Sequence, residues 1–142
     1  MLLYNTLCAT IYTFSGDVLK VYKNAWFGRF ARKQKISAKA LLDAVHRAER
    51  GQIDADLGGG VIKQRISRSG QGKSKGYRSI LLFCKNDKSF FVYGFAKNDL
   101  TNISEAEEEQ FKKMAKYILA LTDSQLNDLI AHGQFEEVVK DD

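Results

Sequence analysis

Two strongly apolar runs, separated by a short polar connection, constrain the fold of this chain more than any other feature. The first run covers residues 77–84 and the second covers residues 89–95, with Asn86-Asp87 between them. Ile, Leu, Phe, Val and Tyr dominate these runs, as is usual for strands, and so short a connection favours a tight turn. The pattern therefore predicts an antiparallel β-hairpin.

A helical hairpin is predicted ahead of these strands. Apolar residues such as Trp26 and Phe30 recur at helical spacing in a segment that begins at Asn24. A second helical segment has Ser37 as its expected N-cap and should stop near Gly51. Two helices joined by a tight turn form a helical hairpin.

Two more helices are predicted after the strands, because the sequence contains two capping boxes there. Ser104 with Glu107 opens the first, and Thr122 with Gln125 opens the second. The second helix is expected to stop at Gly133, because glycine accepts the backbone conformation that ends a helix.

Further strands are expected over residues 17–23, at an edge of the sheet, over residues 61–68 and over residues 135–139. Residues 69–76 read as a glycine-rich loop. Helices, strands and helices in this order predict an α+β fold, with a small and mostly antiparallel sheet. Its N-terminal helical hairpin and its C-terminal helices would flank that sheet.

The chain is expected to form one domain over residues 17–142, because no biased stretch is long enough to be a linker. Residues 1–16 are interpreted as an N-terminal extension. The opening stretch lacks the basic region of a signal peptide, and no run approaches the roughly 18 apolar residues of a membrane span. No membrane partner is therefore expected.

Positive charge is concentrated in one part of the sequence. The net charge is +5, and residues 61–97 contain nine Lys or Arg against one acid, Asp87. Residues 98–142 contain four basic and eleven acidic residues. This asymmetry indicates a basic working segment of the kind that binds a polyanion, followed by an acidic tail.

The two cysteines, Cys8 and Cys84, make neither a disulfide framework nor a zinc-binding spacing. A reducing, cytoplasmic compartment is the expectation, with no metal and no cofactor. No Ser/His/Asp or paired-carboxylate arrangement is evident, and Asp54 with Asp56 is interpreted as a turn device.

The segment Gly70–Ser74 resembles the end of a phosphate-binding P-loop. The complete pattern needs a glycine where Ser67 stands and a helix after the loop, whereas a strand is predicted here. A nucleoside triphosphate site is therefore not expected. Glycines beside Lys73 and Lys75 still suit a nucleic acid backbone, and a solvated flexible loop is the alternative.

Cationic side chains are predicted to gather on one face of the sheet. Lys63 and Arg65 share a face because strand side chains alternate, and Arg78 should point to the opposite side from Tyr77. Such a cluster repels itself unless an anion offsets the charge, although a solvated face is the alternative. Tyr93 could stack an unpaired base, or could simply pack in the core.

Four segments together resemble the RelE/HigB family of toxins, especially its branch with an Asp-Ala-Asp-Leu-Gly-Gly-Gly signature. The segments are residues 26–33, 54–65, 72–78 and 90–98, and the resemblance covers about residues 21–120. Members of this family are toxins of type II toxin–antitoxin pairs, and many cut mRNA in the ribosomal decoding site without a metal. The resemblance implies a RelE-like fold.

The resemblance also implies roles for individual residues. Arg78, in a Gly-Tyr-Arg motif, would contact the scissile phosphate, and Lys97 takes a strand-end position that is arginine in the best-known members. Lys63 and Arg65 match the basic residues of the preceding strand, whereas Ile103 stands near the position of a late catalytic tyrosine. The RNA-binding residues expected beside these catalytic ones are Arg68, Lys73, Lys75, Tyr77, Tyr93 and Asn98.

The function that the resemblance implies is ribosome-dependent cleavage of mRNA, by attack of the 2′-hydroxyl on the scissile phosphate. The implied partners are the ribosome, mRNA and a small helix-turn-helix antitoxin. Two alternatives fit the same basic pattern. One is a non-catalytic inhibitor that binds nucleic acid, and the other is a ParE-like topoisomerase poison.

Overall fold

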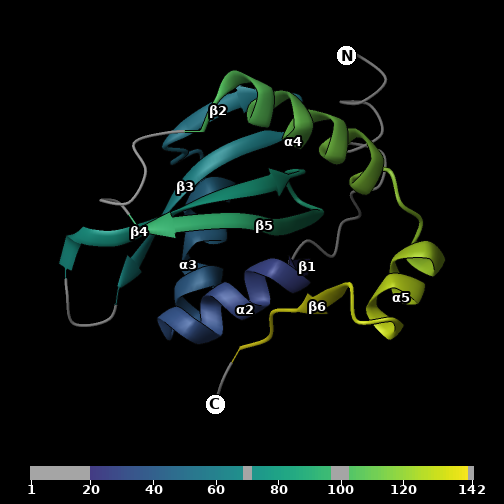
Figure 1. Ribbon diagram of the computed structural model, residues 1–142, viewed down its shortest axis with the longest axis horizontal. Helices are drawn as coiled ribbons and strands as arrows, with labels where there is room; N and C mark the ends of the chain where they lie inside the picture. Colours follow the sequence, from purple (N-terminus) through teal and green to yellow (C-terminus); the bar gives the residue numbers. More distant parts are fainter. Residues whose placement is uncertain (1–19, 69–71, 97–102, 141–142) are drawn as a thin grey trace.

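The computed structural model describes residues 20–68, 72–96 and 103–140, which form an α+β fold with one six-stranded sheet (Figure 1). The strands are β1 (Lys20–Asn24), β2 (Ala55–Gly58), β3 (Val61–Arg68), β4 (Gly72–Phe83), β5 (Lys88–Ala96) and β6 (Phe135–Glu137). The helices are α2 (Ala25–Gln34), α3 (Ala38–Glu49), α4 (Glu105–Ile118) and α5 (Asp123–Ala131). The predicted fold class is confirmed. The predicted extension over residues 1–16 lies outside the described residues.

Three of the four described helices begin at the predicted caps, and α2 begins directly after Asn24, where its segment was expected to start. The Asn24 side chain accepts a hydrogen bond from the backbone N–H of Phe27, at 2.8 Å, and thereby opens α2. Ser37 caps α3 in the same way, and both predicted capping boxes are formed at α4 and α5. Just beyond α5, Gly133 takes a φ of +79°, which is favourable for glycine. Local hydrogen-bonding chemistry therefore sets these boundaries.

The strand order is β2-β3-β4-β5-β1-β6, and it corrects three expectations about the sheet. β1 is not an edge strand, because it pairs in parallel with β5 and antiparallel with β6. β2 was not predicted, and β4 begins at Gly72, inside the segment expected to be a loop. In both places backbone pairing with β3 outweighs a polar, glycine-rich sequence.

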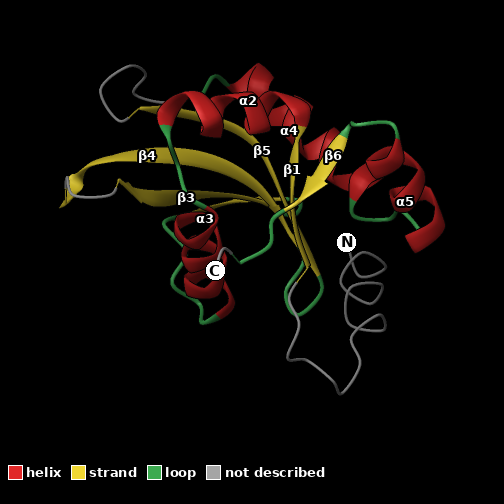
Figure 2. Ribbon diagram, turned by 90° about the horizontal axis from the view of Figure 1, so that it is seen from below, coloured by secondary structure: helices red, strands yellow, loops and turns green. Residues whose placement is uncertain are grey.

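The sheet is buried on both faces, with a separate core on each. α2 and α3 cover one face, where Phe27 and Leu41 pack in a cluster that includes Phe91 of β5. α4 and α5 cover the other face, where Leu126 belongs to the cluster that contains Leu82. In Figure 1, α4 lies in front of the sheet and α3 behind it, and Figure 2 shows how strongly the sheet twists between them.

Cys84 is buried at 2 % exposure in the core under α4 and α5. Within the described residues, no helix has the length and apolar character needed to cross a membrane.

Gly94 of β5 lets α2 pack closely on the sheet, and its replacement tests this contact. An added Cβ would lie 2.6 Å from Cε2 of Phe30 and 3.0 Å from Cε2 of Phe27. We expect Gly94→Ala to lower the free energy of unfolding by about 1–3 kcal/mol, because the core is overpacked. Urea unfolding followed by circular dichroism measures the change.

The double variant Gly94→Ala/Phe30→Leu is the control for this prediction. A leucine side chain at position 30 removes the ring edge that the new methyl group meets. The alanine should therefore cost less in the Phe30→Leu background than in the wild type. An equal cost in the two backgrounds would contradict the proposed clash.

Candidate nucleic-acid interface

Three of the predicted catalytic residues come together on one face of the sheet. In the antiparallel β3–β4 pair, Arg65 stands directly opposite Arg78, and Lys63 stands opposite Ile80. Ile80 belongs to the core under α4 and α5, so the alternation of side chains places all three cations on that same side. We call Lys63, Arg65 and Arg78 the cationic face. Their shared face was predicted from sequence, and their catalytic role stays a prediction.

Gly76 explains why the Gly-Tyr-Arg motif begins with glycine. A Cβ at this position would collide with the backbone carbonyl of Ile66 on β3. The absence of a side chain therefore lets β3 and β4 approach closely just before Arg78. The close contact lies next to the pair of positions at which Arg78 stands opposite Arg65.

Asp54 offsets the repulsion between the two arginines, which would otherwise disfavour their cross-strand pairing. Its Oδ2 accepts a hydrogen bond from the backbone N–H of Arg65 at 2.6 Å, and its Oδ1 lies 3.5 Å from Nη2 of the same arginine. The sequence analysis interprets Asp54 as a turn device and does not predict its contact with Arg65. Asp56 does act in a turn, because its Oδ1 accepts from the N–H of Gly58 at 2.9 Å.

Arg78 is left with a different environment. Its side chain is partly buried, and no carboxylate of residues 20–68, 72–96 or 103–140 forms an ion pair with it. Arg65 is partly neutralised by Asp54, so Arg78 retains more of its capacity to bind an external anion. A guanidinium group can hold two phosphate oxygens at once.

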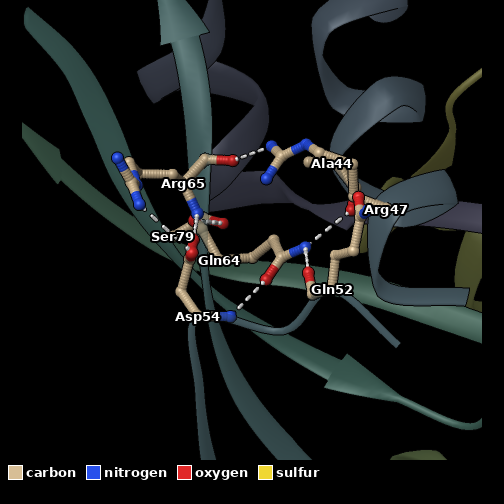
Figure 3. Close-up of polar contacts among 7 residues, drawn as sticks. All are labelled: Ala44, Arg47, Gln52, Asp54, Gln64, Arg65 and Ser79. Atoms are coloured by element: carbon tan, nitrogen blue, oxygen red, sulfur yellow. Dashed lines mark hydrogen bonds and ion pairs between the residues drawn. The ribbon is translucent and has the colours of Figure 1, made fainter. Parts of the chain in front are cut away.

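A buried amide holds Asp54 in place (Figure 3). Gln64 of β3 is fully buried, and its Nε2 donates to the carbonyl oxygens of Ala44 at 2.9 Å and Gln52 at 3.0 Å. Its Oε1 accepts from the backbone N–H of Asp54 at 3.1 Å. These bonds join β3 to α3 and to residues 52–54, which precede β2. They hold Asp54 where its carboxylate reaches Arg65.

Two predicted RNA-binding tyrosines have other surroundings. Tyr77 is 2 % exposed on the face under α2 and α3, as its position beside Arg78 predicted, and its hydroxyl bonds to Oε1 of Gln34 at 3.0 Å. Tyr93 stacks on Trp26, with ring centroids 4.8 Å apart, and leans on Phe111. The packing alternative therefore describes Tyr93 in this structure.

The basic segment does not form a single face, which corrects the interpretation of residues 61–97. Lys88 lies at the start of β5, and its side chain is only 5 % exposed, with Nζ 3.6 Å from Oδ1 of Asp123. Burial raises the pKa of the adjacent Asp87, and burial together with nearby carboxylates raises the pKa of Tyr22 to about 12. These perturbed groups lie away from the cationic face.

The remaining predicted site residues are only partly described. Lys97 and Asn98 lie outside the described residues. The backbones of Arg68, Lys73 and Lys75 lie in β3 and β4. Ile103, near the position of the family's late tyrosine, is 9 % exposed in the core and offers no titratable group there. Within the described ranges, no three His, Cys, Asp or Glu side chains gather to hold a metal ion.

Lys63, Arg65 and Arg78 give this α+β fold a basic sheet face, a charge pattern that is typical of proteins that bind polyanions. A family model described as "RelE toxin of RelE / RelB toxin-antitoxin system" matches residues 19–138. The chain belongs to this family, and it is therefore a toxin of a toxin–antitoxin system. The search of curated proteins finds no match.

Replacement of Gln64 tests how strongly the buried amide supports the site. Gln64→Met keeps much of the side-chain volume but leaves the Ala44 and Gln52 carbonyls and the Asp54 N–H without their partner. Each buried group without a partner costs about 1–3 kcal/mol, so we expect a marked loss of unfolding free energy. Urea unfolding would measure it.

Gln52→Ala is the matched control, because only the backbone carbonyl of the exposed Gln52 takes part in the network. This variant should unfold within about 0.5 kcal/mol of the wild type. If Gln64→Met were as stable as the wild type, the hydrogen bonds of the Gln64 side chain would not be what stabilises the site.

Proposed function

We propose that this toxin is a ribosome-dependent mRNA endoribonuclease. The observation that carries the proposal is the position of Arg78, which lies on the cationic face without an ion-pair partner among the described residues. Its cross-strand neighbour Arg65 is tied to Asp54, and Lys63 extends the same face along β3. Membership of the RelE toxin family supports this proposal.

In the proposed reaction, the ribose 2′-hydroxyl attacks the adjacent phosphorus and the 5′-oxygen leaves. Negative charge develops on the phosphoryl oxygens, and Arg78 would hold two of them in a bidentate contact. Lys63 or Lys97 is proposed as the base that removes the hydroxyl proton. The need for a 2′-hydroxyl would restrict the reaction to RNA.

RNA would extend from the cationic face along the β3–β4 pair. Arg68, Lys73 and Lys75 follow on these strands, and Asn98 follows β5 with Lys97. Lysine and arginine contacts of this kind supply sequence-independent affinity for the phosphate backbone. We assign these residues to RNA binding and the cationic face to the reaction.

The proposed antitoxin is a small helix-turn-helix protein that masks the cationic face. RelE-family toxins pair with antitoxins, and a partner with acidic side chains would complement Lys63, Arg65 and Arg78. The ribosome, as the proposed partner in cleavage, places the action of the toxin in the cytoplasm.

Arg78→Ala tests the proposed chemistry directly. We expect this variant to lose toxicity and to lose at least about 2.7 kcal/mol of transition-state stabilisation, or roughly a hundredfold in rate. Growth after induction and primer extension on cellular mRNA are the measurements. Cleavage inside translated codons should be seen with the wild type and be absent with the variant.

Arg29→Ala is the control, because Arg29 is an exposed arginine on α2. It should remain toxic, and all three proteins should have similar thermal melts. Undiminished killing by folded Arg78→Ala would rule this residue out of the mechanism. Wild-type toxicity with intact mRNA would favour a non-catalytic inhibitor, and inhibited DNA supercoiling would favour a topoisomerase poison.

Binding of the antitoxin should respond to salt mainly through its association rate. Opposite charges on two proteins speed their encounter, and added salt screens this attraction. Stopped-flow association and dissociation rates of the purified pair across a salt series would measure both steps. An association rate that is independent of salt would show that the antitoxin does not approach through the cationic face.

A further inference from the structure

A second basic site lies on the opposite side of the sheet. A cavity of about 490 Å³ opens where the turn between α2 and α3 meets β3 and β4. Buried Tyr77, on the face under α2 and α3, forms part of its wall, whereas Arg78 points to the other face. The cavity is therefore separate from the cationic face.

Cations dominate the lining of this cavity. They are contributed by Lys35, Lys39, Arg47 and Arg50, with His46 beside them. Asp43 is the only carboxylate of the described lining, and its Oδ2 pairs with Lys39 at 3.1 Å. Positive charge thus exceeds negative charge in the cavity, and an anionic ligand would offset the excess.

The backbone at Lys35 provides an independent indication. Lys35 ends α2 with a φ of +57° and a ψ of +44°, a left-handed conformation in which glycine is the favoured residue. Few lysines adopt it, and unfavourable backbone conformations cluster at binding sites. This conformation places an exposed lysine in the lining of the cavity.

The cavity is also connected to the cationic face through β3. Nη2 of Arg47 donates a hydrogen bond to the backbone carbonyl of Arg65 at 2.5 Å, while the Arg65 side chain belongs to the opposite face. The same residue of β3 is therefore in contact with a cation that lines the cavity and contributes its own cation to the other face. The volume suits a single nucleotide unit rather than a folded protein partner.

We propose that this cavity binds a backbone phosphate of RNA outside the cleavage site, with Lys35 and Arg50 as its principal cations. The inference rests on the proposed function, because it gives the same RNA-directed toxin a second RNA contact. Arg47 is a positioning residue in this account, since its guanidinium also holds the carbonyl of Arg65.

The test measures binding of a short labelled single-stranded RNA by fluorescence anisotropy. All proteins carry Arg78→Ala so that the RNA stays intact. The site variant adds Lys35→Gly and Arg50→Gln, and the control variant adds Lys113→Gln and Lys116→Gln, which remove two charges from exposed positions on α4. Net charge is thereby matched between the variants.

We expect the site variant to bind RNA about tenfold more weakly than the control. The slope of log affinity against log salt should become shallower by about 0.7 for each RNA phosphate that the variant no longer neutralises. Lys35→Gly alone should melt at or above the temperature of its parent, because glycine relieves the left-handed backbone. Weaker binding in a protein of undiminished stability would separate ligand binding from folding.

Three results would overturn the proposal. Equal affinities and salt slopes for the site and control variants would show that only net charge matters. Unchanged RNA binding by the site variant would show that the cavity does not bind RNA. Calorimetric binding of inorganic phosphate that disappears in the site variant, without any decrease in RNA affinity, would assign the cavity to a free anion. None of these measurements requires cleavage, so their outcome is independent of whether Arg78→Ala abolishes toxicity.

Discussion

The arrangement of the site depends on the hydrogen bonds of one buried amide, Gln64. Its side chain satisfies two carbonyls and one N–H from segments that would otherwise have buried polar groups without partners. Ser79 of β4 adds a bond from its Oγ to the Gln64 backbone carbonyl at 2.8 Å. A polar core residue therefore connects α3, Asp54 and the two strands that carry the cationic face. An apolar side chain could fill this space but could not specify where Asp54 lies.

Local structure was largely predictable from sequence because its causes are local. Helices α2 to α5 begin at side chains that bond to N–H groups within three residues, and such spacings can be read directly. The β4–β5 hairpin was equally clear, since a short turn joins two apolar runs. The common face of Lys63, Arg65 and Arg78 follows from the alternation of side chains, once the strands are known.

The features that could not be predicted from sequence depend on contacts between distant segments. β1 pairs in parallel with β5 about seventy positions later, and no local pattern distinguishes this inner strand from an edge. Asp54 lies eleven residues before Arg65, and β2 and a bulge bring its carboxylate back to that arginine. The count of basic residues over 61–97 could not reveal that Lys88 is buried beside Asp123. Charge density along a sequence is thus a poor guide to charge density on a surface.

The position of β6 has a consequence for how the chain is made. β6 completes the sheet by pairing with β1, and the N–H of Val138 also donates to the carbonyl of Val21 at 2.8 Å. During synthesis, more than one hundred residues separate the exit of these two segments from the ribosome. Until the later one emerges, β1 has an unpaired edge, and such long-range pairings form slowly. The topology therefore delays completion of the native sheet until β6 has been synthesised.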